Sequence, residues 1–120
     1  MRTLDMRAPA SADAALIARV AGAVRGSSDA LGLSRAVLFG SVARGDHHPR
    51  SDVDIALVWP DGADEEFCLD AAISIGLNVE AAADMSCIPL PYTESEYGGL
   101  SAGLTSELEM DGIDLLTYPT

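Results

Sequence analysis

The sequence predicts an α/β (α+β) fold in which a small mixed β-sheet is flanked by helices. Apolar residues recur at helical spacing near the N-terminus, two short apolar segments around a glycine turn have strand character, and a longer helical segment follows them. The chain has 120 residues, 48% of them hydrophobic, which is enough for one packed domain and too few for two. We therefore expect a single domain over residues 1–120, with residues 1–10 as a flexible arm.

The first half of the chain is expected to contain one helix and two strands. The helix begins with Ser11 as its N-cap and runs to about residue 25. Residues 35–39 form a short apolar strand, and residues 40–45 form a tight turn that opens a short helix. Residues 52–59 alternate and then become apolar, as a second strand does. The connection between these two strands is too short to contain a full crossover helix. This indicates a mixed sheet rather than a parallel βαβ unit.

The second half is expected to begin with a helix that opens at Asp64 and is apolar on nearly all sides, so it should be well buried. This helix ends near Gly76 or continues to Ala82. A third strand is expected over residues 84–90, at a sheet edge because of Pro89. Thr93 and Glu96 have the spacing of a capping box at a helix start. A short helix over 104–110 and a closing strand over 113–116 are expected to follow.

The charge of the chain limits its partners. Seven basic residues face nineteen acidic ones, for a formal net charge of −12. Such a surface repels a phosphate backbone, so we expect no nucleic-acid binding and favour a basic protein partner. The sequence shows neither a signal peptide nor an apolar run of membrane-spanning length, so we expect a cytoplasmic protein without membrane association. Cys68 and Cys87 are expected to be buried free thiols.

The chemistry is concentrated in residues 39–57, FGSVARGDHHPRSDVDIAL, in which Gly-Ser is followed after ten residues by Asp-x-Asp. Gly40 lets the backbone turn sharply near a bound group, and Ser41 starts a short helix whose N–H groups favour an anion such as a triphosphate. Asp52 and Asp54 lie two apart on a strand, so both carboxylates project from one face. Two such carboxylates, together with substrate phosphates, are typical of a Mg²⁺ site.

This segment resembles the G-S-x(10)-D-x-D signature of the DNA polymerase beta-like nucleotidyltransferase superfamily. It is most similar to the minimal nucleotidyltransferases, small proteins often paired with a HEPN-domain protein in toxin–antitoxin modules. The resemblance is strongest over about residues 35–58 and weaker over the rest of the chain. It implies a single nucleotidyltransferase domain with a mixed sheet flanked by helices. It also implies transfer of a nucleotide, often AMP from ATP, with two Mg²⁺ ions.

The resemblance further implies a third carboxylate on a later strand, which binds metal or acts as the base. Asp84, expected to open the third strand, is the preferred candidate; Glu80 is the alternative, and the chain lacking a third carboxylate is the remaining possibility. Arg44, one helical turn past Ser41, is either a fork donor to a phosphate or a surface arginine. His47 and His48 are expected to be solvated loop residues.

The leading interpretation is therefore an adenylyltransferase that modifies a tyrosine of a HEPN-type toxin and acts as its antitoxin. One alternative is transfer to a small molecule such as an aminoglycoside. Larger relatives do this with an additional helical domain, which we do not expect in a chain of 120 residues. The other alternative is an antitoxin that neutralises its toxin by binding alone. The base preference, the number of nucleotides transferred and the oligomeric state stay open.

Overall fold

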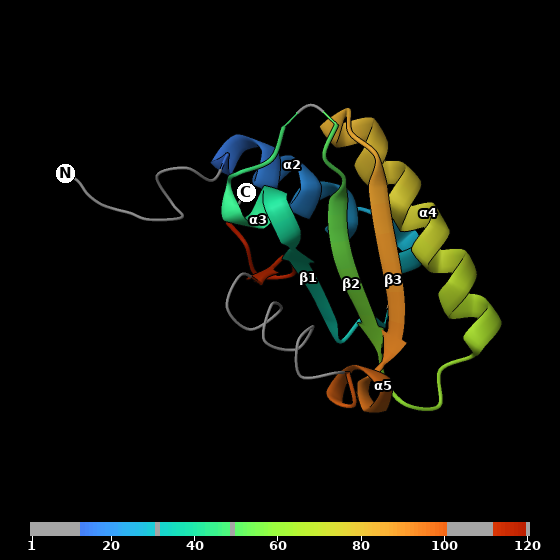
Figure 1. The fold of residues 1–120 in the computed structure, drawn as a ribbon. Helices are drawn as coiled ribbons and strands as arrows, with labels where there is room; N and C mark the ends of the chain where they lie inside the picture. Colours follow the sequence, from blue (N-terminus) through green and yellow to red (C-terminus); the bar gives the residue numbers. More distant parts are fainter. Residues whose placement is uncertain (1–12, 31, 49, 101–111, 120) are drawn as a thin grey trace.

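The structure is a computed structural model that describes residues 13–30, 32–48, 50–100 and 112–119 (Figure 1). The expected arm, Ser11 and the expected helix over 104–110 lie outside these residues. The elements in chain order are α2 (Ala14–Arg25), the 3₁₀ turn η2 (Ser28–Ala30), β1 (Arg35–Phe39), α3 (Gly40–Arg44), β2 (Val53–Trp59), α4 (Glu65–Ala83), β3 (Cys87–Thr93), α5 (Glu94–Gly98) and β4 (Ile113–Asp114). None of the helices described is both long and apolar enough to span a bilayer.

The four described strands form one mixed sheet in the order β3-β2-β1-β4. β1 pairs antiparallel with β2 and with β4, whereas β2 and β3 are parallel. Helix α4 makes the crossover that a parallel pair requires. β3 lies at the end of this order and contains Pro89 and Pro91, which have no N–H to donate to a further strand. The predicted mixed sheet and the edge position of Pro89 are confirmed.

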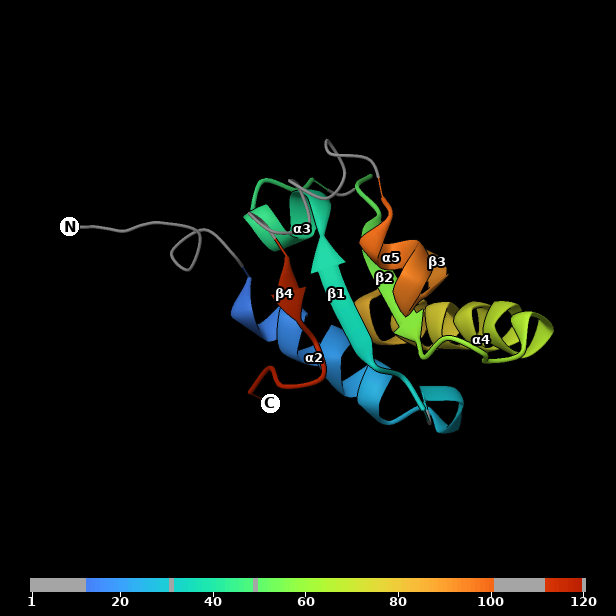
Figure 2. The ribbon, with the colours of Figure 1, turned by 90° about the horizontal axis from the view of Figure 1, so that it is seen from below.

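The helices cover the sheet unequally. Figure 2 shows α2 and α4 on one side of the sheet and α3 and α5 on the other. The main core lies under α2 and α4 and includes Leu38, Ile55, Leu57 and Trp59, all at most 1% exposed. A smaller apolar cluster on the other side is centred on Phe39 and Ala56. The side of the sheet that carries α5 therefore has the smaller apolar cluster, whereas Val42 and Ala43 of α3 belong to the main core.

The start of α2 differs from the expectation. Asp13, not Ser11, is the N-cap: its Oδ1 accepts a hydrogen bond from the backbone N–H of Leu16 at 2.9 Å. An aspartate at this position satisfies a helical N–H that has no partner within the helix and places negative charge at the positive end of the helix.

Helix α4 is longer than one of the predicted alternatives, and the strand after it begins later than predicted. α4 does not end at Gly76; this glycine is buried, and a Cβ built on it would lie 2.9 Å from Cγ of Pro89. Glycine here lets the helix pack closely on β3 without interrupting it. β3 begins at Cys87, so the prediction of a strand starting at residue 84 was wrong.

The prediction that α4 is buried on nearly all sides was also wrong. Leu69, Ile73 and Leu77 are 48%, 59% and 61% exposed, while the face of α4 that meets the sheet includes the fully buried Ile75 and Val79. Apolar composition shows that a helix can be buried, but the number of elements that pack against it decides how many of its faces are covered.

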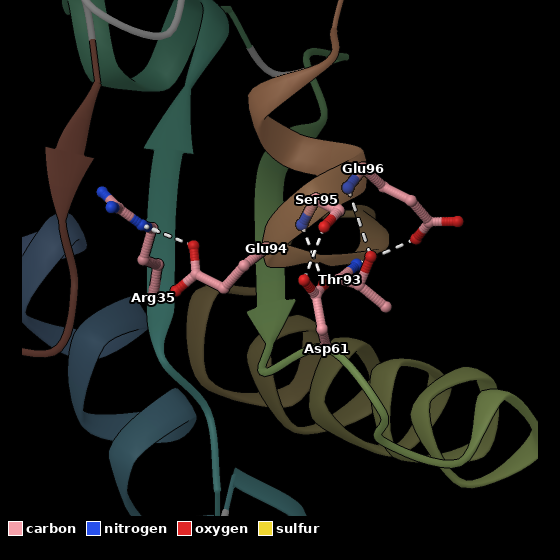
Figure 3. Close-up of polar contacts among 6 residues, drawn as sticks. All are labelled: Arg35, Asp61, Thr93, Glu94, Ser95 and Glu96. Carbon is pink, nitrogen blue, oxygen red and sulfur yellow. Dashed lines mark hydrogen bonds and ion pairs between the residues drawn. The ribbon is translucent and has the colours of Figure 1, made fainter.

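Short polar contacts hold α5 at the end of the sheet where β2 and β3 finish. Figure 3 shows Asp61, just after β2, accepting hydrogen bonds from the Ser95 backbone N–H (2.9 Å) and hydroxyl. Arg35 at the start of β1 forms an ion pair with Glu94, with Nε 3.3 Å from Oε1. The predicted capping box at the start of α5 is confirmed, between Thr93 and Glu96.

Candidate active site

The first part of the candidate site is the turn that joins β1 to α3. Gly40, directly after β1, has a φ of +79°, in the left-handed region that a side chain disfavours. Ser41 follows it near the start of the five-residue helix α3, which ends at Gly45 with a second positive φ of 83°. The predicted strand, glycine turn and short helix are confirmed.

The second part is Asp54 on β2, which lies directly against Gly40. β1 and β2 pair so that Phe39 is opposite Asp54. A Cβ built on Gly40 would overlap Oδ2 of Asp54 and lie 3.4 Å from its Cγ. Glycine at position 40 is therefore required twice, once by the backbone conformation and once by the close approach of this carboxylate.

Asp52 joins Asp54 on the same face. Val53 and Ile55 are fully buried in the main core, whereas Asp52 and Asp54 are half-buried. Alternation along an extended chain therefore turns both aspartates to the opposite face, which carries α3 (Figure 2). Asp52 precedes the first residue of β2 rather than lying on the strand, one residue away from the prediction. The structure brings the four motif residues to one end of the sheet.

The loop between α3 and β2 is held by hydrogen bonds around His48. The His48 backbone N–H donates to Ser51 Oγ (2.9 Å), and the Ser51 N–H donates to the His48 carbonyl (2.8 Å). The N–H of Arg50 donates to His48 Nδ1 (3.2 Å), which occupies the lone pair that a metal would need at that nitrogen. His47 is half-buried rather than solvated, and its Nδ1 has no hydrogen-bond partner among the described residues.

Arg44 lies in the last turn of α3 and forms an ion pair with Asp46, with Nε 3.1 Å from Oδ2. Both side chains are more than a third exposed, at 39% and 62%, so the pair contributes only about 0.2–1 kcal/mol. A triphosphate is a more highly charged partner than one exposed carboxylate. The Arg44 guanidinium lies on the same short helix as Ser41. Its weak ion pair with Asp46 can be exchanged for a contact with a phosphate.

Asp84 has a different setting from the one predicted. It does not open a strand; it is the C-cap of α4, in the left-handed region with a φ of 55°, and its side chain is exposed. Its backbone N–H donates to the carbonyl of Glu80 at 2.9 Å. The turn that follows lies beside the start of β2, because the Val53 N–H donates to the Ser86 carbonyl at 2.8 Å. Asp84 therefore belongs to the same end of the sheet as Asp52, but on a turn.

The neighbouring positions on β3 supply no carboxylate. Ile88 is opposite Asp54 in the parallel register, and the strand from Cys87 to Thr93 contains no acidic residue. Glu80 lies on α4, as predicted, but its Oε2 accepts a hydrogen bond from the Cys87 N–H at 3.0 Å. Glu80 thereby satisfies the first N–H of the edge strand.

Cys87 is close enough to the two aspartates to be affected by their charge. Burial, followed by the negative charges of Glu80, Asp54 and Asp52, raises the pKa of its thiol to about 12. The thiol is consequently neutral at ordinary pH and is not activated as a nucleophile. Sequence reasoning missed this proximity, since it depends on the register between β2 and β3.

The donor set fits a hard divalent cation. Asp52 and Asp54 offer carboxylate oxygens, and Mg²⁺ typically binds one or two carboxylates together with substrate phosphates. Among the described residues, no group of three His, Cys, Asp or Glu side chains is placed to hold a metal. Phosphate oxygens of a nucleotide are the further ligands that a Mg²⁺ ion bound by two carboxylates typically takes.

Residues 24–100 match the sequence model of the nucleotidyltransferase domain. The matched region covers more than half of the chain and includes the complete motif. No curated protein matches the sequence.

Several solved structures share the fold. A chain of a toxin–antitoxin complex with AMP-PNP is 22% identical, with a TM-score of 0.58 over 82% of this chain and 71% of that chain. A chain of the MntA–HepT toxin–antitoxin complex is 18% identical, with a TM-score of 0.53 over 86% and 71%. A chain from the complex of the tri-AMPylated Shewanella oneidensis HEPN toxin with its MNT antitoxin is 19% identical, with a TM-score of 0.52 over the same shares. These likenesses confirm the polymerase beta-like nucleotidyltransferase fold.

Proposed function

Because the chain belongs to the nucleotidyltransferase domain family, we propose that it transfers AMP from ATP to a hydroxyl group of a HEPN-type toxin and so acts as the antitoxin of that toxin. One observation supports this more than any other: the turn at Gly40 lies directly against the carboxylate of Asp54, with Ser41 beside it and Asp52 on the same face. A decayed or unrelated domain would not need to keep so close an approach between a glycine turn and a half-buried carboxylate.

In the proposed reaction the acceptor oxygen forms a bond to the α-phosphorus of ATP. The bond from that phosphorus to the oxygen bridging to the β-phosphate breaks, and pyrophosphate leaves with the electron pair. Asp52 and Asp54 would hold two Mg²⁺ ions together with the phosphates, and these ions would supply the positive charge that stabilises the attacking and leaving oxygens. Ser41 would position the phosphates through its hydroxyl and N–H, and Arg44 would exchange Asp46 for a phosphate oxygen.

The acceptor hydroxyl must also lose its proton. We assign the third carboxylate to Asp84, because its side chain is exposed and its turn is hydrogen-bonded to the start of β2. Glu80 is the alternative candidate, although it already accepts the Cys87 N–H. Without either residue, the proton would pass to a phosphate oxygen or to water.

The choice of acceptor rests on the structural relatives and on charge. One relative is a toxin–antitoxin complex with AMP-PNP, and another contains a tri-AMPylated HEPN toxin. The formal net charge of −12 favours a partner with a basic surface, whose encounter with this chain would be accelerated by electrostatic steering. ATP and Mg²⁺ are both plentiful in the cytoplasm, where we place the reaction. A tyrosine hydroxyl of the toxin is the acceptor that we propose.

One observation favours a second candidate function, neutralisation of the toxin by binding alone. On β3 the residue opposite Asp54 is Ile88, where a third carboxylate would share the face of the other two. An antitoxin that acts by contact needs no base at this position. The two candidates differ in whether Asp52 and Asp54 are necessary for protection.

Co-expression tests this difference directly. A HEPN-type toxin is expressed with the wild-type chain or with the Asp52→Asn, Asp54→Asn variant, and growth is measured. Transfer predicts rescue by the wild type alone. Full rescue by the double variant, with its fold verified by circular dichroism, would establish neutralisation by binding. Labelling of an aminoglycoside from ATP with no labelling of the HEPN protein would instead establish a small-molecule transferase.

A further inference from the structure

The outer face of α4 carries a row of exposed aliphatic side chains. Leu69, Ile73 and Leu77 are spaced by four residues, which places them along one side of the helix. Each is about half exposed or more, at 48%, 59% and 61%. Figures 1 and 2 show α4 at the margin of the molecule, with no other described element on its outer side. We call these three residues the α4 row.

The charged residues of α4 itself are all acidic. The helix contains Glu65, Glu66, Asp70 and Glu80, and it contains neither lysine nor arginine. A row of aliphatic side chains bordered by carboxylates is complementary to an amphipathic helix with an apolar face bordered by basic residues.

A hollow of about 240 Å³ adjoins the first residue of the row. Leu69 lines it together with Pro91 and Tyr92, while Glu65 and Glu96 contribute carboxylates. Burial raises the pKa of the Tyr92 hydroxyl, and the charge of Glu96 adds to this effect. The hollow therefore combines an apolar wall with negative potential, a combination that suits the aliphatic stem and charged head of an arginine or lysine.

We propose that the α4 row and the adjoining hollow form a docking site for a basic amphipathic helix of a partner protein. The aliphatic face of that helix covers Leu69, Ile73 and Leu77, and a basic side chain at one end enters the hollow between Glu65 and Glu96. A second copy of this chain is disfavoured as the occupant, because a symmetric pairing of α4 with itself brings only carboxylates to the border of the interface.

This site is separate from the candidate active site. Figure 2 shows α4 on one side of the sheet and α3 on the other. Val53 and Ile55 belong to the main core on the α4 side, so the alternating Asp52 and Asp54 project from the opposite side. A partner held on α4 consequently leaves the nucleotide site open. The inference does not depend on the proposed function, and the Asp52→Asn, Asp54→Asn variant is expected to bind the same helix with unchanged affinity.

The test uses fluorescence anisotropy with a panel of synthetic amphipathic helices whose aliphatic face is bordered by arginines, each paired with a version in which glutamates replace the arginines. At least one basic helix should bind the wild-type chain, and its acidic counterpart should bind at least tenfold more weakly. The Ile73→Ser, Leu77→Ser variant should bind that helix at least tenfold more weakly than the wild type. Ile88→Ser is the matched control, because Ile88 is also exposed (42%) but lies on β3, and it should bind normally.

Circular dichroism of each variant verifies the fold, which exposed positions should not disturb. Equal binding of basic and acidic helices, no binding by any basic helix, or unchanged binding by Ile73→Ser, Leu77→Ser would each overturn the proposal. Sedimentation tests whether a second copy of the chain occupies this face. A wild-type dimer that dissociates in the Ile73→Ser, Leu77→Ser variant would show that it does, and would likewise overturn the proposal.

Discussion

Replacing Gly40 with alanine perturbs the candidate site at its closest contact. Alanine at a φ of +79° costs about 1–2 kcal/mol, because the left-handed region brings Cβ against the following carbonyl oxygen. The new Cβ would also overlap Oδ2 of Asp54, so the carboxylate must leave its preferred rotamer at a further cost of about 0.5–1.5 kcal/mol. We expect Gly40→Ala to lower the free energy of unfolding by about 1.5–3.5 kcal/mol. We also expect it to reduce AMP transfer about 100-fold, since a displacement of about 1 Å at a reacting centre has an effect of this size.

Gly62 provides a matched control. It too has a positive φ, of 91°, but nothing lies within 4 Å of a Cβ built on it. Gly62→Ala should therefore show the backbone cost alone, about 1–2 kcal/mol, with AMP transfer unchanged. Urea unfolding measures the stability of both variants, and transfer of label from ATP measures their activity. If the two variants lose equal stability and equal activity, the contact between Gly40 and Asp54 has no functional importance and the reasoning is refuted.

Three further predictions concern single side chains. Ser41→Ala should weaken transfer less than loss of either aspartate does, because we propose that Ser41 positions the phosphates and is not the nucleophile; a covalent nucleotide on Ser41, detected by mass spectrometry, would contradict this. Asp84→Asn should reduce the rate of transfer much more than Glu80→Gln, whereas small and equal effects would mean that the third carboxylate is absent and would favour binding alone. Hydrogen bonds from Ser95 lower the pKa of the Asp61 carboxyl below its ordinary 3.8. The stability that this carboxylate contributes is therefore present above pH 3.8 and is lost as the pH falls through the lower folded-state pKa. Urea unfolding at a series of pH values should show a loss at acid pH that is smaller in Asp61→Ala; identical curves would show that Asp61 does not anchor α5.

The sequence alone was sufficient for the fold class and for the motif. Gly40, Ser41, Asp52 and Asp54 are close in the chain, so the two strands and the turn between them settle their arrangement with little help from the rest of the molecule. The steric reason for glycine at position 40 could not be predicted from the sequence. It depends on the pairing of Phe39 with Asp54, which the one-dimensional pattern does not specify.

Two errors have a common physical origin in α4. Asp84 was expected to open a strand, but α4 continues to Ala83 with Asp84 as its C-cap, and its Gly76 packs tightly on Pro89 of β3. The exposure of Ile73 could not be predicted either, because residue types show that a helix can be buried on every side but not how many neighbours it has. The end of α4 and the exposure of its outer face both depend on contacts between segments distant in sequence, which the local sequence pattern does not predict.

The most direct test of the central claim is intact-mass spectrometry of a HEPN-type toxin after incubation with this chain, ATP and Mg²⁺. With the wild-type chain we predict a mass increase of one or more AMP groups, located on a tyrosine by peptide mapping. With the Asp52→Asn, Asp54→Asn variant, or with Mg²⁺ removed by a chelator, we predict no increase. An unmodified HEPN protein that nevertheless binds the wild-type chain and loses its toxicity would contradict the claim of AMP transfer.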